Sequence, residues 1–227
     1  MRSTVLIFFI VLTTFNLFSQ NKEITIVFNP KFNGDKLELD KQYNFNNDTI
    51  AVSNLKFYIS SIQFFKDDTL TYTIAKQYHL LNIENTSSLT ISDSIDLLSS
   101  FNYMVFNLGI DSITNVSGVF GNDLDPTNGM YWTWQSGYIN FKLEGTSMLC
   151  KARNNVFQFH LGGYQYPFSS VQKIKLPIEN NNIINIDIKL EKFLKTIDLS
   201  SIFEVMSPGQ EAVDLSKNCS KIFEISK

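Results

Sequence analysis

Short segments in which apolar and polar residues alternate make up most of this chain, and they constrain its fold more than any other feature. The clearest is 137–145, in which the two kinds of residue occupy alternate positions: Ile139, Phe141 and Leu143 on one face, Tyr138, Asn140, Lys142 and Glu144 on the other. Side chains two residues apart in a strand share a face, so this period predicts a half-buried β-strand. Similar segments recur with no strong helical pattern between them. We therefore predict an all-β chain, an antiparallel, Greek-key-like β-sandwich.

The remaining predicted strands are read from the same period or from runs of β-branched and aromatic residues. They are 23–28, 55–65, 78–83, 101–110, 156–161, 171–178 and 184–190. The asparagine run at 180–182 predicts a hairpin turn between the last two.

The period changes near the C-terminus. Residues 190–197 fit a helical turn or two, and an amphipathic stripe follows Ser207-Pro208-Gly209: Ala212, Leu215, Cys219 and Ile222. This spacing predicts a short C-terminal helical segment that covers one edge or end of the sandwich.

Residues 1–20 have the pattern of a signal peptide. Arg2 supplies a positive start, and Val5 to Phe18 is almost entirely apolar but short for a bilayer span. The alternative is an uncleaved anchor. We expect cleavage to leave residues 21–227 as a single domain, exported to the periplasm or secreted. No cysteine near the junction could accept a lipid, and no later stretch predicts stable membrane insertion.

Charge and cysteine content narrow the function further. Loss of Arg2 with the signal takes the net charge from −3 to −4, and no basic cluster is present, so nucleic-acid binding is disfavoured. Cys150 and Cys219 form an even pair in an exported chain, which allows a disulfide. Two buried free thiols, or thiols that bind a metal, are the alternatives.

Both tryptophans of the chain, Trp132 and Trp134, lie two residues apart after a loop rich in acids and turn formers, 121–128. An indole in a loop is costly unless it packs or serves a function. Asp123 and Asp125 resemble a calcium loop, but the glycine falls one residue late and the terminal glutamate is absent. An Asx turn is the favoured interpretation.

The chain has only two histidines. His160 ends a predicted strand just before Gly162-Gly163, where a side chain can reach a loop at one end of the sandwich. His79 lies in a core-like strand, which favours a structural role. For either histidine the alternative to a functional role is burial with a hydrogen-bonded neighbour.

A zinc site with only two histidines would need carboxylates or thiols to complete it. Copper(I) takes low coordination numbers and binds imidazole and sulfur ligands. One or two histidines with Met130 or an aromatic amine would suffice. No nucleophile elbow, phosphate-binding glycine loop or other catalytic motif is present, so we expect a protein that is not an enzyme.

Several segments together resemble the MbnP-like family. The most specific is Tyr131-Trp132-Thr133-Trp134-Gln135-Ser136-Gly137-Tyr138, followed by Lys142-Leu143-Glu144-Gly145. Phe157-Gln158-Phe159-His160-Leu161-Gly162 is similar to a later segment of that family. Residues 55–60 and 205–208, with Asn218 and Phe223, give further support. The resemblance covers nearly the whole mature chain.

The resemblance implies an exported β-sandwich that binds copper through histidines and a tryptophan oxidised to kynurenine. The oxidation is attributed to a partner dihaem enzyme related to MauG. Carried over to this chain, Trp132 or Trp134 is the oxidised residue, His160 is a copper ligand and His79 is the other available imidazole. One copper-binding member has a histidine two residues after the oxidised tryptophan, where this chain has Trp134 or Ser136.

Three hypotheses follow. The first is an exported, non-enzymatic copper-binding protein whose site joins His160 to the tryptophan loop. The second is a binding module that recognises a glycan or a protein through the aromatic residues of 131–138. The third is that both indoles simply fill one end of the core. Indoles that point inward toward His160 would favour the first hypothesis, and indoles flat on the surface the second.

Overall fold

The structure is a computed structural model that describes residues 21–96, 100–135 and 137–226. The predicted signal peptide, 1–20, lies outside the described residues. The strands are β1 (Asn21–Phe32), β2 (Asp35–Lys36), β3 (Tyr43–Phe45), β4 (Asp48–Lys66), β5 (Thr69–Thr73), β6 (Tyr78–Asn82), β7 (Thr90–Asp96), β8 (Tyr103–Leu108), β9 (Tyr131–Trp132), β10 (Gly137–Ser147), β11 (Val156–Gly162), β12 (Gln172–Pro177), β13 (Ile183–Lys189), β14 (Glu204–Val205) and β15 (Phe223–Ile225). The helices are α1 (Ser112–Val116), α2 (Leu190–Leu194) and α3 (Gln210–Cys219), with single 3₁₀ turns at η1 (Thr86–Leu89), η2 (Asn122–Leu124), η3 (Pro126–Asn128), η4 (Arg153–Asn155) and η5 (Ser220–Ile222).

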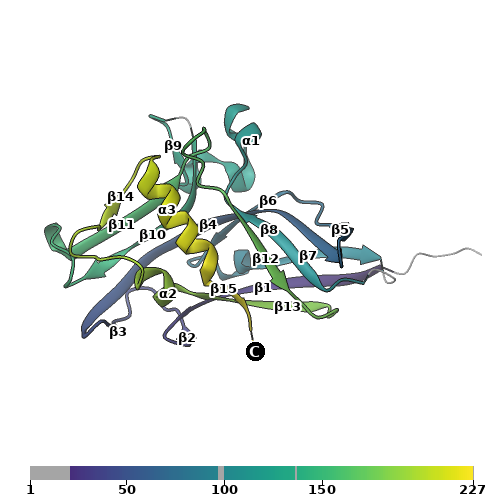
Figure 1. The fold of residues 1–227 in the computed structure, drawn as a ribbon, viewed down its shortest axis with the longest axis horizontal. Helices are drawn as coiled ribbons and strands as arrows, with labels where there is room; N and C mark the ends of the chain where they lie inside the picture. The colour runs from purple at the N-terminus through teal and green to yellow at the C-terminus, as the bar shows by residue number, and fades with distance from the viewer. Residues whose placement is uncertain (1–20, 97–99, 136, 227) are drawn as a thin grey trace, which may run out of the picture.

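These strands form the expected β-sandwich (Figure 1). One sheet has the order β15-β13-β1-β2, with β7 also paired to β1, and the other has the order β12-β8-β4-β10-β11-β14. Phenylalanines from both sheets meet between them. The ring of Phe28 on β1 lies 6.5 Å from Phe57 on β4 and 6.0 Å from Phe106 on β8, measured between centroids. Edge-to-face packing of this kind stabilises the core beyond the burial of area alone.

Two strand pairs depart from the predicted antiparallel arrangement. β1 pairs with β13 and β11 with β14 in parallel, so both sheets are mixed. The partners in each pair are far apart in sequence and are not joined by a hairpin, which would impose the antiparallel direction. The predicted hairpin turn at 180–182 is likewise wrong. β12 pairs with β8 and β13 with β1, so these residues cross from one sheet to the other.

The long strand β4 organises the larger sheet. Along one side it pairs with β10 up to Phe57 and then with β8 from Ile59 onward. The sheet therefore forks where the start of β10 and the end of β8 diverge beside β4. Asn140 of β10 closes this fork from within, because its Oδ1 accepts from the N–H of Ile110 at 2.9 Å and its Nδ2 donates to Oγ of Ser170 at 2.8 Å.

The fork also breaks the predicted alternation of 137–145. The pairing register with β11 shifts between Ile139 and Phe141, as in a β-bulge. Asn140, predicted to face outward, is buried as a result. Ile139 leaves the core between the sheets and joins a second cluster, here called the outer cluster: Tyr58, Ile110, Leu124, Met130, Trp132, Tyr138 and Ile139.

The outer cluster lies on the face of the larger sheet that points away from the main core. Phe57 and Ile59 belong to the main core, and Tyr58 between them belongs to the outer cluster. Because neighbouring side chains in a strand point to opposite faces, Tyr58 and its cluster define this outer face.

The predicted C-terminal helix is α3, which packs against β11 (Figure 1). Its stripe of Ala212, Leu215 and Cys219 is buried in the main core. Cys150 is also buried there, and both cysteines are free thiols. Among the described residues, no helix combines the length and hydrophobicity needed to cross a bilayer.

Candidate functional site

Trp132 is nearly buried on the outer face, with only 6 % of its surface exposed. It ends β9, which pairs with the start of β10. Its six-membered ring lies directly over Gly162 of β11. A Cβ placed on Gly162 would come 2.6 Å from Cζ3 of Trp132 and 2.7 Å from the carbonyl oxygen of Tyr138. A glycine is therefore required at the end of β11 for this ring to pack against the strand.

His160 lies on the same face of β11 as Gly162, two residues before it. Leu161, between them, points into the main core. Positions two apart in a strand are separated by about 6–7 Å, so the imidazole is one same-face position from the glycine that Trp132 covers. The structure thus brings His160 and Trp132 to one face of one strand. The imidazole itself is buried.

Glu144 of β10 holds the His160 ring in place. Nε2 of His160 lies 2.6 Å from Oε1 of Glu144, and Asn54 donates from Nδ2 to Oε2 at 2.9 Å. The hydrogen bond from His160 is the main cause that lowers the pKa of Glu144 to about 2, against the opposing effect of burial. Glu144 is therefore ionised at neutral pH, and an ionised carboxylate can only accept hydrogen bonds.

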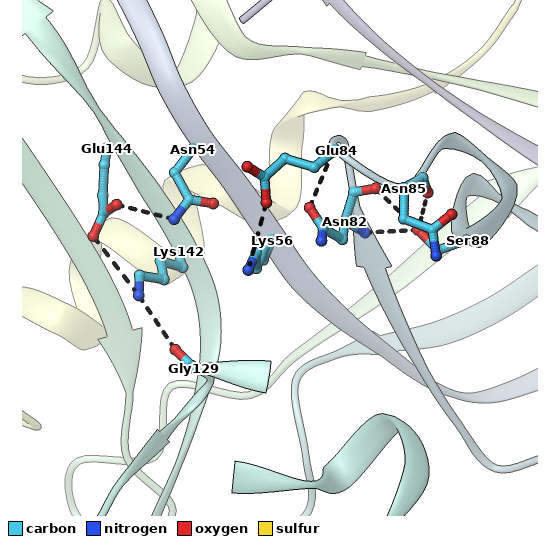
Figure 2. A network of polar contacts seen from close by, with 9 residues as sticks. All are labelled: Asn54, Lys56, Asn82, Glu84, Asn85, Ser88, Gly129, Lys142 and Glu144. Carbon is cyan, nitrogen blue, oxygen red and sulfur yellow. Dashed lines mark hydrogen bonds and ion pairs between the residues drawn. The ribbon is translucent and has the colours of Figure 1, made fainter. Parts of the chain in front are cut away.

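Lys142 connects this pair to the tryptophan loop. Its Nζ lies 3.7 Å from Oε1 of Glu144 and donates to the carbonyl oxygen of Gly129 at 3.2 Å. Figure 2 shows Asn54, Glu144 and Lys142 in this arrangement. Sequence reasoning did not identify Glu144 or Asn54 as site residues. The sequence did place Glu144 on the polar face of its predicted strand. Which residues of other strands lie beside Glu144, however, depends on the register between the strands.

Trp134 occupies a different environment from Trp132. Its surface is 63 % exposed, and its ring centroid lies 5.8 Å from that of Trp132 at an interplanar angle of 45°. Each indole therefore fits a different hypothesis for the loop. Trp132 points inward beside β11, as expected for a metal site, and Trp134 is exposed, as expected for a binding module.

His79 does not join this site. On β6 it pairs with Ile59, whose side chain belongs to the main core, so His79 lies on the opposite face of the sheet from His160. Its Nε2 is 2.9 Å from the carbonyl oxygen of Lys76. Burial, together with the nearby Lys76 charge, lowers the pKa of His79. This favours the structural role that its strand context predicted.

Other donors near His160 are few. Met130 is fully buried in the outer cluster beside Trp132, whereas both cysteines lie in the main core. Within the part of the chain that the structure describes, no three His, Cys, Asp or Glu side chains gather closely enough to hold a metal ion. The unmodified site thus offers one imidazole and one carboxylate, and the thioether of Met130 lies in the outer cluster with Trp132.

Tyrosine hydroxyls hold the acidic loop over the outer cluster. Tyr58 donates to the carbonyl oxygen of Asp123 and Tyr138 to that of Leu124, and burial raises the pKa of Tyr58. Asp125 accepts from the N–H of Thr127, which is the predicted Asx turn. Asp123 pairs with Lys76 at 2.6 Å. Both aspartates therefore have structural partners.

The fold and the outer-face site define a β-sandwich protein with a buried indole beside a carboxylate-bound imidazole. A family model described as MbnP matches residues 21–207, and the chain belongs to the MbnP family. The solved structure of MbnP from Methylosinus trichosporium is similar in fold, with a TM-score of 0.57, 11 % sequence identity and coverage of 84 % of this chain and 83 % of that chain. No curated protein matches the chain.

Proposed function

We propose that this protein is an exported, non-enzymatic copper-binding protein whose site is His160 together with Trp132 after its oxidation to kynurenine. The observation that carries the proposal is the contact of the Trp132 ring with Gly162, one same-face position from His160. Trp134 is exposed and His79 is on the opposite face, so neither is part of the proposed site.

Glu144 supports a ligand role for His160. Because ionised Glu144 can only accept, Nε2 of His160 carries the shared proton. In the neutral imidazole the lone pair is then on Nδ1, which can bind a soft metal. A carboxylate behind a ligating histidine fixes its tautomer and orientation, and its loss commonly costs about 10–100-fold in metal affinity.

The fit of copper depends on the modification. Unmodified tryptophan donates through its indole N–H and has no ligand nitrogen, and the described residues supply too few other donors here. Conversion to kynurenine breaks the Cγ–Cδ1 bond and places one oxygen atom on each carbon, a four-electron oxidation that consumes two peroxide molecules and releases two of water. Hydrolysis then breaks the Nε1–Cδ1 bond and releases Cδ1 as formate, while Cγ remains as a ketone. The freed aromatic amine is a new ligand nitrogen. The electrons removed pass to peroxide through the proposed partner, a MauG-like dihaem oxidase.

The direct test is a copper(I) titration of residues 21–227 purified after co-expression with such an oxidase. We expect His160→Ala to abolish tight binding and His79→Ala, the matched control on the opposite face, to leave it unchanged. Equal affinity in the wild type and His160→Ala would remove His160 from the site.

Mass spectrometry tests the modification separately. Replacement of one carbon by one oxygen raises the mass by about four units, and fragmentation of the 131–138 peptide assigns the change to one indole. We expect it at Trp132. A change at Trp134 alone, or an unchanged mass, would contradict the proposal.

A further inference from the structure

Three loops meet at the start of β10. They are residues 111–121, which include α1, the turn at 133–135, and residues 164–169. A Cβ placed on Gly137 would lie 3.1 Å from Cε1 of Tyr164 and 3.6 Å from Oδ1 of Asn115. The N–H of Tyr138 also donates to Asn115 at 2.9 Å. One point on β10 therefore contacts both α1 and the 164–169 loop, and the tryptophan turn adjoins it in sequence.

These loops carry most of the large apolar side chains that the described residues expose. Seven of the ten lie here: Ile113, Val116, Val119, Phe120, Trp134, Tyr166 and Phe168. We call these seven residues the three-loop surface. Exposed apolar side chains gathered on adjoining loops are typical of interaction sites in soluble proteins.

α1 buries its polar side and exposes its apolar side, the reverse of a helix that covers a core. Its buried residues are the polar Thr114 and Asn115, whereas Ile113 and Val116 are 78 % and 73 % exposed. Asp111 caps the helix by accepting from the N–H of Thr114, and Asn115 donates to the carbonyl oxygen of Ile110. The polar side is anchored to the protein body, so the apolar side is presented to solvent by a fixed backbone.

The charges near the three-loop surface indicate which kind of partner could bind there. Residues 77–141 contain no lysine or arginine, and the segment around the surface contributes Asp111 and Asp125, whereas Asp123 is paired with Lys76. Binding to an anionic membrane depends on basic residues, which are missing from these loops. A symmetric contact with a second copy would bring like charges together.

We propose that the three-loop surface docks a different protein, one whose contact face is apolar and rimmed by lysine or arginine. Trp134 is its central anchor, since large exposed aromatic side chains contribute most to interface energy. The surface adjoins the buried indole through the contact between Trp134 and Trp132. This proposal does not depend on copper, because every residue of the surface lies outside the His160–Glu144 pair.

The first experiment places a photo-cross-linking amino acid at Phe120 of the full chain in its native cells. The matched control positions are Leu70 and Met148, which are also exposed and apolar but lie outside the three loops. We expect one protein to cross-link from Phe120 and not from the controls. Cross-linking to a second copy of this chain, equal capture from all three positions, or no cross-link at Phe120 would each overturn the proposal.

The second experiment measures binding of the captured protein after purification. We expect Val116→Asp to weaken binding by about tenfold or more, Met148→Asp to leave it unchanged, and added salt to reduce it. Metal-free protein and His160→Ala should bind as the wild type does, which separates this proposal from the copper proposal. Insensitivity to Val116→Asp, or equal binding of the chain to phosphatidylglycerol vesicles, would contradict it.

Discussion

At the scale of single residues, the position of the Trp132 ring depends on the absence of a side chain at Gly162. We expect Gly162→Ala to displace the ring and to lower the free energy of unfolding by about 1–3 kcal/mol, because the added methyl group overpacks the site. Urea unfolding followed by tryptophan fluorescence measures both effects. The control is Gly121→Ala, where a Cβ meets open space and φ is −89°. An equal change in both variants would contradict the assignment.

Glu144 predicts a pH dependence of stability. Its folded pKa of about 2 is below the unfolded value of 4.5. A depressed carboxyl pKa contributes stability that is fully present above pH 4.5 and is lost as the pH falls toward 2. We expect Glu144→Gln to flatten the stability profile in this window, as measured by urea midpoints.

A double-mutant cycle with His160→Gln identifies the source of that effect. Since the hydrogen bond from His160 is the largest cause of the shift, the two substitutions should be non-additive. Additive effects would show that Glu144 is stabilised by other groups.

At the scale of elements, the fork between β8 and β10 is closed by one side chain. Asn140→Ala leaves the buried N–H of Ile110 without its acceptor, which costs about 1–3 kcal/mol. We expect faster amide exchange at Ile110 and a lower urea midpoint. Ser170→Ala removes only the second hydrogen bond and should cost about 0.5–1.5 kcal/mol. Unchanged exchange at Ile110 would argue that the fork is held by packing alone.

Alternation predicted strands correctly along most of their length and failed at this fork. Alternation predicted β1, β10, β11, β12 and β13, because a side chain's face follows directly from backbone geometry. It failed at Ile139 and Asn140, where the register shifts. A bulge depends on the strands on either side, here β8 and β10 diverging from β4, and alternation within one segment contains no information about them.

At the scale of the whole molecule, both cysteines lie in the core between the sheets. Burial raises the pKa of Cys219 and of Cys150, so both thiols are protonated and shielded. We expect no reaction of native protein with Ellman's reagent and reaction of both thiols after unfolding. The intact mass should be the same with and without reductant. A mass deficit that reduction removes would establish a disulfide instead.

The candidate site was predicted in part. The motif that contains both tryptophans and the strand that ends in His160 were recognisable from the sequence, and the structure brings Trp132 and His160 to one face. The sequence could not distinguish Trp132 from Trp134, because burial depends on whether Gly162 of another strand lies beneath the ring. Strand context favoured a structural role for His79, but only the structure shows that His79 and His160 lie on opposite faces of one sheet.

The sequence by itself determined the β-class of the chain, most of its strands, its C-terminal helix and its family resemblance, because periodicity and short motifs are local properties. Only the tertiary structure decided which strands pair, that 180–182 crosses between sheets, and that Glu144 binds His160. These features join residues that are distant in the chain. They depend on the register that buries the most apolar surface across both sheets together.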